Sequence, residues 1–384
     1  MTSTAGVELR SLVLPSYARH DVTFVEGAGC WLVASDARRY LDFAAGVAVV
    51  ALGHRHPEPL AAAHAQLDRL WHASNLYWTE PMLALAGRLS DRFGGAQAFF
   101  CNSGAEAIEA AIKYARRTTG KPGIVALEGS FHGRTLGALS VTGQPAKQER
   151  FGPLVGGVSF TRPNDVESLE KTVSPGAETG LILLEPVLGE GGVRELTVEF
   201  VEAAAEISSE LGALLCLDEI QTGVGRTGTF FAFEQLGIRP HLTTLAKGLA
   251  NGLPIGCLLV ADEVAGGFEP GTHASTFGGN PVACAAACAV CDTIDDELLA
   301  GVRAGGQRLA TGLGRLPGVL ETRGRGLLLA AELDRAAAPV VAAALENGLL
   351  VTSAGETTLR LTPPLVVSED EIDSALEILR EVLA

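Results

Sequence analysis

Basic residues are scarce in this sequence of 384 residues: 29 Lys and Arg stand against 45 Asp and Glu, a formal charge of −16. This acidic balance excludes a general binder of nucleic acids or of anionic membranes. The sequence also lacks an uninterrupted apolar run of eighteen residues, and residues 1–10 lack the basic start and apolar stretch of a secretory signal. We therefore expect a cytoplasmic protein that has neither a membrane nor a nucleic acid as partner.

Cysteine is sparse as well. Seven cysteines, an odd number spread over this length, favour reduced core thiols over a disulfide framework. Apolar residues, by contrast, make up 47% of the chain and charged residues only 19%. This composition excludes a disordered chain and provides for a large core, and the length predicts one large domain with a smaller companion.

Only five lysines are present, and four of them lie in polar or turn-like contexts. Lys247 differs, because it follows the short apolar run 242–246 and precedes the glycine-containing loop 248–252. A lysine at the end of a buried strand is partly desolvated, which lowers its pKa and leaves a nucleophilic free amine. Lys247 is thus a candidate for Schiff-base chemistry.

Short apolar runs alternate with helix-length segments from about residue 96 onward. This order predicts a mainly parallel sheet covered by helices on both faces, with ligands bound at the carboxyl ends of its strands. The two ends of the chain have a different pattern, which predicts a smaller α+β unit formed by both. Its expected strands lie near residues 22–25, 30–34, 40–43, 326–333, 349–352 and 358–361, and its expected helices near 337–347 and 369–383.

One glycine-rich motif matches a dinucleotide fingerprint. Residues 223–228 read GVGRTG, which fits G-x-G-x-x-G, but the following residues are a poor helix start. Asp218 and Glu219 precede the motif, and their carboxylates would repel a pyrophosphate. We therefore predict no dinucleotide site.

The cysteine and histidine patterns offer little metal chemistry. Cys284, Cys288 and Cys291 have the spacing C-x3-C-x2-C, but they lie in an Ala-rich segment that should be helical, where they would share one apolar face. His54 and His56 stand two residues apart, with no third ligand suggested nearby. We predict core packing for the cysteines and no metal site.

Polar groups at the ends of three predicted strands together fit one ligand. Residues 102–106 follow a strand and open a helix, whose free N–H groups could bind a phosphate, with Ser103 adding a hydroxyl. Asp218 ends another apolar strand, where its carboxylate needs a cationic partner such as a protonated ring nitrogen. With the amine of Lys247, these features describe pyridoxal phosphate, for which the carboxylate keeps the pyridine nitrogen protonated.

Two further residues would complete such a site. Phe131 could stack on the ring of the cofactor, and Gln221, three residues after Asp218, could bond its hydroxyl. Each feature alone also has an ordinary explanation, since the helix start could be a simple cap and the aspartate could form a structural salt bridge.

These residues stand in motifs that resemble the class III, fold type I aminotransferases, and within them the acetylornithine aminotransferases. The resemblance runs nearly from end to end of the chain. It is carried by the motifs SNLYWTEP at 74–81, NSGAEA at 102–107, FHGRT at 131–135, EPVLGEGGV at 185–193, LDEIQTGVGRTG at 217–228, TLAKGLANGLPIG at 244–256, STFGGNP at 275–281 and LRLTPPL at 359–365.

The resemblance implies an α/β fold of type I: a large domain with a mainly parallel seven-stranded sheet covered by helices, and a smaller α+β domain from both termini. The implied boundaries are 1–45 for the N-terminal part of the small domain, 46–270 for the cofactor-binding domain and 271–384 for a long helical connection with the rest of the small domain. The implied cofactor is pyridoxal 5'-phosphate. Its implied binding residues are Ser103, Gly104, Ala105, Phe131, Asp218, Glu219, Ile220, Gln221, Lys247 and Thr276.

Within that set, Lys247 resembles the catalytic lysine that forms the Schiff base with the cofactor. Thr276 resembles a residue that reaches the phosphate from the other subunit, which implies a homodimer with composite active sites. Arg134 and Ser275 resemble residues close to the acetylornithine substrate. Arg360 resembles the arginine that receives a carboxylate of 2-oxoglutarate, and Glu190 resembles its gate. Pairing with Glu190 would mask the charge of Arg360 during the other half-reaction.

The resemblance implies transfer of the δ-amino group of N2-acetyl-L-ornithine to 2-oxoglutarate by a ping-pong route, as in arginine biosynthesis. Val47 stands where ornithine aminotransferases tend to carry a tyrosine, which favours an acylated substrate. Succinylornithine, succinyl-diaminopimelate, ornithine and 4-aminobutyrate remain alternative donors, and an aminomutase is a further alternative. The chain departs from the family pattern at Ala105, often threonine, at Ile108, often asparagine, and at Ala274, often glycine.

Overall fold

A seven-stranded sheet organises the larger part of the molecule. The computed structural model describes residues 10–173 and 178–384. The strand order is β4-β12-β11-β10-β7-β5-β6, and β12 alone runs antiparallel to its neighbours, so the prediction of a mainly parallel sheet is confirmed. The strands are β4 (Ala96–Cys101), β5 (Gly123–Leu127), β6 (Val158–Thr161), β7 (Thr179–Leu184), β10 (Leu214–Asp218), β11 (Leu242–Leu245) and β12 (Gly256–Ala261).

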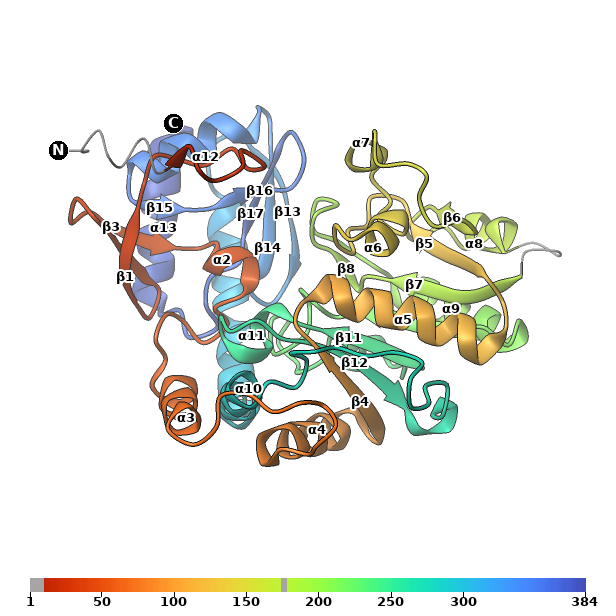
Figure 1. Cartoon of the computed structure of the whole chain (residues 1–384). Helices are drawn as coiled ribbons and strands as arrows, with labels where there is room; N and C mark the ends of the chain where they lie inside the picture. The colour runs from red at the N-terminus through yellow and green to blue at the C-terminus, as the bar shows by residue number, and fades with distance from the viewer. Residues whose placement is uncertain (1–9, 174–177) are drawn as a thin grey trace.

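Both faces of this sheet are covered. Successive side chains of a strand point to opposite faces, so Leu181 and Leu183 pack with the core under α5, while Ile182 and Leu184 pack with the core that includes α9. Figure 1 shows α5 crossing one face of the sheet. The helices of this part are α4 (Glu80–Phe93), α5 (Gly104–Thr119), α6 (Leu136–Ser140), α7 (Pro145–Gln148), α8 (Val166–Thr172) and α9 (Val198–Glu210).

Two four-stranded sheets form the other part of the molecule, on the left in Figure 1. In the first, β15 (Leu349–Leu350) pairs in parallel with β3 (Arg39–Asp42), so the two ends of the chain share one sheet. The first sheet also contains β1 (Phe24–Ala28) and β2 (Trp31–Ala34), and the second contains β13 (Val319–Arg325), β14 (Leu328–Leu333), β16 (Thr352–Ser353) and β17 (Thr358–Leu361). The helices here are α11 (Asp296–Leu313), α12 (Ala337–Glu346) and α13 (Glu369–Leu383).

A smaller α+β unit from both chain ends is thus confirmed, while the boundaries 1–45, 46–270 and 271–384 stay predictions, with residues 1–9 outside the described part. Further short elements are α2 (Ala45–Ala48), α3 (Pro57–Leu67), β8 (Val187–Leu188) and β9 (Arg194–Glu195). In the described ranges, no helix combines the length and the apolar character needed to cross a bilayer.

One sequence expectation was wrong, and one strand was not predicted. The segment 349–352 was expected as one strand, but β15 ends at Leu350 and β16 begins at Thr352 in the other small sheet. The prediction was wrong because apolar character marks burial and does not show which sheet a strand joins. Strand β13, whose residues are only partly buried or exposed, was not predicted at all.

The cysteine motif and the glycine-rich motif both lie in packed parts of the fold. Cys284, Cys288 and Cys291 lie in α10 (Pro281–Thr293), which packs on α3 and α4, and all three contact the same apolar core. In the glycine-rich motif, the buried Arg226 donates hydrogen bonds to the carbonyl oxygens of Leu327 and Pro363. The motif therefore joins the seven-stranded sheet to the smaller unit.

Candidate active site

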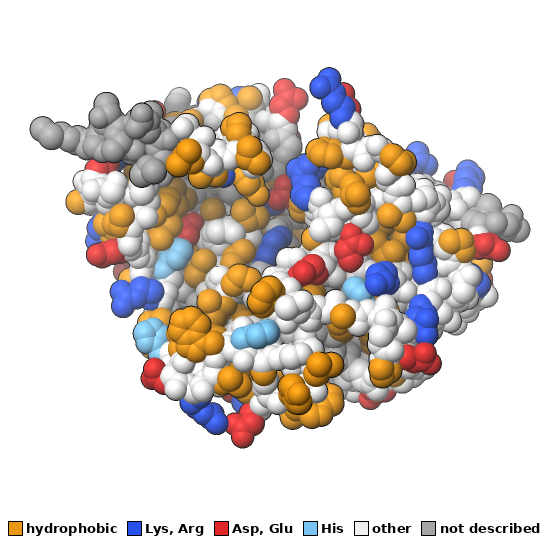
Figure 2. Space-filling view, in the orientation of Figure 1, with side chains coloured by type: hydrophobic (Ala, Val, Ile, Leu, Met, Phe, Trp, Pro, Cys, Tyr) orange, Lys and Arg blue, Asp and Glu red, His pale blue; other side chains and the backbone are white. Residues whose placement is uncertain are grey.

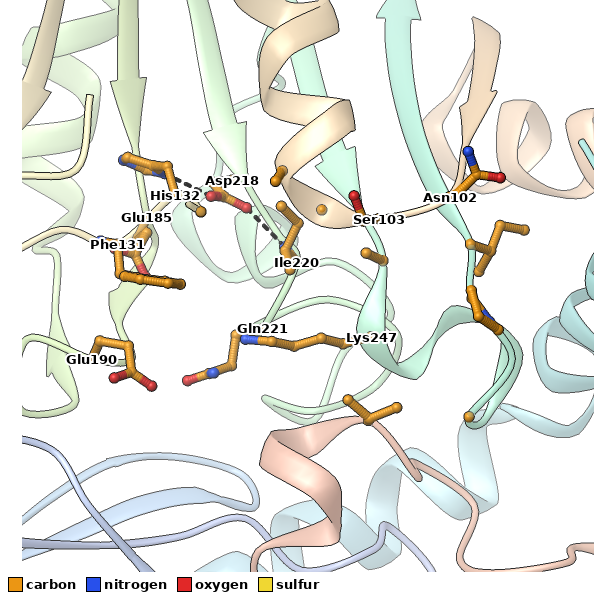
Figure 3. Close-up of a pocket in the computed structure, with 18 of the residues that line it drawn as sticks. Asn102, Ser103, Phe131, His132, Glu185, Glu190, Asp218, Ile220, Gln221 and Lys247 are labelled. Carbon is orange, nitrogen blue, oxygen red and sulfur yellow. Dashed lines mark hydrogen bonds and ion pairs between the residues drawn. The ribbon is translucent and has the colours of Figure 1, made fainter. Parts of the chain in front are cut away.

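A cavity of about 290 Å³ lies at the carboxyl ends of the parallel strands. The loops after β4, β5, β7, β10 and β11 line it, and the antiparallel β12 adds the segment just before its start. Figure 2 shows the molecule hollowed between its two parts. The predicted site residues on the cavity wall, most of them labelled in Figure 3, are Ser103, Gly104, Ala105, Phe131, Glu190, Asp218, Ile220, Gln221 and Lys247.

Asp218 is the last residue of β10 and is 4% exposed. Its Oδ2 lies 2.7 Å from Nδ1 of His132, and its Oδ1 accepts hydrogen bonds from the Thr244 hydroxyl and the Ile220 N–H, each 3.0 Å long. Figure 3 shows His132 and Ile220 on either side of the carboxylate. A buried carboxylate held this firmly can stabilise a cation in the cavity, such as a protonated ring nitrogen.

Lys247 begins the short 3-10 helix η2 (Lys247–Ala250), just after β11. Its side chain extends into the cavity beside Gln221 (Figure 3). Removal from bulk water and, second, the charge of Arg360 lower the pKa of Lys247 to about 8, although nearby carboxylates oppose the shift. A lowered pKa increases the fraction of neutral, nucleophilic amine at physiological pH.

The start of α5 provides an anion cradle. The Ser103 hydroxyl caps the helix by accepting a hydrogen bond from the N–H of Glu106, while Gly104 and Ala105 occupy the first two helical positions, whose N–H groups have no partner within a helix. A Cβ on Gly104 would lie 2.8 Å from Cδ1 of Ile220, so a side chain there would clash. The cradle therefore presents backbone N–H groups, which suit a phosphate.

Gln221 has an unused acceptor. Its side-chain Oε1 is buried and has no hydrogen-bond partner among the residues that the structure describes, and the residue is 7% exposed. A Cβ on Gly189 would lie only 1.8 Å from this oxygen, so the amide depends on glycine at that position. A buried acceptor of this kind calls for a donor, and the phenolic hydroxyl of pyridoxal phosphate is one. Acceptor, amine, carboxylate and N–H cradle thus fit this cofactor.

A group of charged residues adjoins the cavity: Glu190 lines its wall, and Arg360, which does not, pairs with Glu190. Arg360, on β17 and 3% exposed, has its Nη1 2.7 Å from Oε1 of Glu190 and 2.8 Å from the carbonyl oxygen of Gly189. Glu190 therefore keeps its pKa below the usual range, because the positive charges of Arg360 and its neighbours outweigh its burial. Arg134, beside the ring of Phe131 at 5.5 Å, is exposed. The expected pairing of Glu190 with Arg360 is present in the structure.

Five predicted site residues do not line the cavity: Arg134 and Arg360, described above, and Glu219, Ser275 and Thr276. The buried carboxylate of Glu219 accepts hydrogen bonds from the N–H groups of Ala232 and Phe233, so its side chain fixes the loop after β10 and does not face the cavity. Ser275 and Thr276 line a separate surface hollow of about 800 Å³. Only the hydroxyl of Ser275 approaches the site, where it accepts a hydrogen bond from Asn102.

Two site residues were missed from the sequence. His132 holds Asp218, and Glu185, directly after β7, accepts hydrogen bonds from the N–H groups of Phe131 and Gly189. Burial raises the pKa of Glu185 to about 7. The signal was available, because a carboxylate at the end of a buried strand is the same feature that identified Asp218.

Known proteins resemble the chain along nearly its whole length. Residues 15–383 match the family described as aminotransferase class-III. The acetylornithine aminotransferase of Gloeobacter violaceus is 49% identical, over 97% of this chain and 96% of that protein. The solved structure of N-acetylornithine aminotransferase from Stenotrophomonas maltophilia is 35% identical, with a TM-score of 0.83 and 96% of each chain covered.

A third relative is described with the cofactor in its active site. The ornithine aminotransferase of Toxoplasma gondii superposes with a TM-score of 0.93 at 31% identity, covering 98% of this chain and 92% of that one, and is described with partial occupancy of PLP at its active site. The cavity described above has the groups that such a cofactor requires. The chain therefore belongs to the class III aminotransferase family, and it is a pyridoxal-phosphate-dependent aminotransferase.

Proposed function

We propose that the enzyme transfers the δ-amino group of N2-acetyl-L-ornithine to 2-oxoglutarate in the cytoplasm, as a step of arginine biosynthesis. The observation that carries the choice of acceptor is the ion pair between Glu190 and Arg360, which lies beside the cavity that contains Lys247. A masked arginine suits an enzyme that binds an amine and a dicarboxylic acid in turn in one pocket. An aminomutase would need no second carboxylate substrate.

The cofactor, when bound, supplies an electron sink for the carbon that carries the transferred amine. We assign its retention to Lys247, and its phosphate to the cradle of Gly104 and Ala105 at the start of α5. Asp218 would hold the ring nitrogen in its protonated form, and Phe131 would lie against the ring. Once released, the amine of Lys247 would move the substrate proton, since its lowered pKa suits both giving and taking one near neutral pH.

Two arginines would bind the carboxylates of the substrates. Arg134, exposed at the mouth beside Phe131, would hold the carboxylate of the amino donor. Arg360 would hold a carboxylate of 2-oxoglutarate after Glu190 has moved away. Val47, in the short helix α2, stands where ornithine aminotransferases tend to carry a tyrosine, which supports an acylated donor. The name of the relative from Gloeobacter violaceus supports the same donor.

We also propose a homodimer with composite active sites. Thr276 is exposed in this single chain and lies away from the cavity, as expected of a residue that serves the other subunit. Leu76 and Trp78, which line the same hollow, are 84% and 79% exposed, and Tyr77 between them is 70% exposed. Such exposure of neighbouring large apolar side chains is typical of a surface that a partner covers. Figure 2 shows apolar side chains gathered at the lower edge of this face, over α4.

A panel of half-reactions tests the proposed function. The yellow purified enzyme is mixed separately with N2-acetylornithine, ornithine, succinyl-diaminopimelate, succinylornithine and 4-aminobutyrate, and the rates of bleaching are compared. N2-acetylornithine should bleach the enzyme fastest, and 2-oxoglutarate should restore the colour. Faster bleaching by another amine would reassign the donor but keep the reaction class, whereas colour recovery without an added keto acid would favour an aminomutase.

The reaction of the cofactor-free protein with pyridoxal phosphate should depend on pH with a midpoint near 8. Only the neutral amine is a nucleophile, and the pKa of Lys247 is lowered from 10.5 to about 8. The rate at which the yellow band forms should therefore rise with pH and level off above about pH 8 to 9. Rates that still climb about tenfold between pH 9 and 10 would show that the amine titrates as an ordinary lysine.

A further inference from the structure

Lys147 lies close to the gate formed by Glu190 and Arg360, although its sequence context is an ordinary turn. It belongs to the short helix α7 (Pro145–Gln148), on the part of the molecule that carries the large sheet, whereas Arg360 lies on β17 of the smaller unit. The Nζ of Lys147 is 3.7 Å from Oε2 of Glu190 and 4.6 Å from the centre of the Phe131 ring. Its side chain is 23% exposed.

Glu190 thus stands between two cations in unequal contact. Its Oε1 makes a close, charge-assisted hydrogen bond of 2.7 Å with Arg360, whereas its Oε2 faces Lys147 across a distance too long for a hydrogen bond. Arg360 is further fixed by the Gly189 carbonyl oxygen and the Thr352 hydroxyl. Within residues 10–173 and 178–384, the ammonium of Lys147 has no comparable hydrogen bond, and the Phe131 ring supplies only a cation–π contact.

We propose that Lys147 is a positioning residue that receives the Glu190 carboxylate when a substrate carboxylate takes its place on Arg360. The proposal rests on the proposed function, in which 2-oxoglutarate binds Arg360. A displaced carboxylate that found no cation in this half-buried place would repel the incoming dicarboxylate. Shortening the distance from 3.7 Å to an ordinary charge-assisted hydrogen bond requires a movement of about 1 Å.

This role separates the two half-reactions. During reaction with the amino donor, Glu190 stays paired with Arg360, and Lys147 contributes little to binding or rate. During reaction with 2-oxoglutarate, the energy of the open gate depends on Lys147. Its loss should therefore weaken the dicarboxylate alone, and a role of Lys147 in folding would not produce that asymmetry.

The test uses holoenzyme with Lys147→Met, which keeps the apolar stem and removes the charge, and Lys147→Arg, which restores a cation. In single-turnover measurements on the aminated enzyme, Lys147→Met should raise the half-saturating concentration of 2-oxoglutarate about 10-fold. The same variant should react with N2-acetylornithine within about twofold of the wild type, and Lys147→Arg should recover most of the loss. Lys171→Met, at an exposed lysine paired with Glu167, is the matched control and should change neither half-reaction.

The Lys147→Met substitution in a Glu190→Gln background tests whether Lys147 acts through the charge of Glu190. Without the Glu190 charge, Lys147→Met should have no further effect on 2-oxoglutarate. Equal losses in both half-reactions, no loss in either, or an undiminished effect of Lys147→Met in the Glu190→Gln background would each overturn the proposal. Failure of the wild-type enzyme to react with 2-oxoglutarate would instead contradict the proposed function, so the two failures are distinguishable.

Discussion

Replacing Lys247 with alanine is expected to lower kcat by about 10⁴-fold, the largest effect of any single substitution in the chain. The amine has two proposed tasks, holding the cofactor and moving the substrate proton, and no neighbour can take over either. Among the described residues that line the cavity, Lys247 is the only lysine. The measurement is the steady-state kcat for amino transfer, together with the absorbance band of the bound cofactor, which should shift to that of the free aldehyde.

The control for this variant is Lys171→Ala, at an exposed lysine of α8 that does not line the cavity. It should keep full activity. The Lys247→Ala protein should also unfold at a temperature no lower than that of the wild type in the cofactor-free state, because the substitution removes an amine whose cationic form is disfavoured by its surroundings. More than about a tenth of the wild-type kcat in Lys247→Ala would contradict the assignment.

Local sequence patterns could bring several proposed site residues to one place in the fold, because these residues follow buried strands. Asp218 and Lys247 each come at or just after the end of an apolar run, and the parallel order of β10 and β11 brings both ends to one edge of the sheet. Ser103 was identified in the same way, as the cap of a helix that follows β4. For these residues, local patterns and the geometry of a parallel sheet are sufficient.

Residues that meet across the fold could not be placed from local patterns. Lys147 and Arg360 are more than two hundred positions apart, and only the packing of the smaller unit brings both to Glu190. Glu219 is a prediction that failed for the same reason: it stands next to Asp218 in the sequence, but its carboxylate accepts hydrogen bonds from the N–H groups of Ala232 and Phe233, at the start of the 3-10 helix η1 (Ala232–Leu236). Side-chain direction depends on such partners, which the sequence does not reveal.

Replacing Asp218 with asparagine is expected to cost about 2–5 kcal/mol in transition-state stabilisation, a loss of roughly 30- to 5,000-fold in kcat. Asparagine has nearly the same shape: its Oδ1 can still accept the hydrogen bond of the Thr244 hydroxyl, and its Nδ2 can donate one to Nδ1 of His132, so the geometry should survive. It lacks the charge that would keep the ring nitrogen of the cofactor protonated. The measurement is kcat for both half-reactions, which should fall together because both depend on the same ring.

A cofactor analogue and a second aspartate make this prediction specific. Pyridoxal phosphate methylated at the ring nitrogen carries a permanent positive charge, so it should restore part of the activity of Asp218→Asn. The matched variant is Asp42→Asn, since Asp42 is also buried and pairs with a histidine, His54, at 2.8 Å, but lies outside the cavity wall. We expect Asp42→Asn to lower the unfolding temperature and to keep kcat within about threefold, because a buried pair is weakened without touching the reacting ring. Equal losses of kcat in the two variants would mean that Asp218 acts through the fold and not through the cofactor.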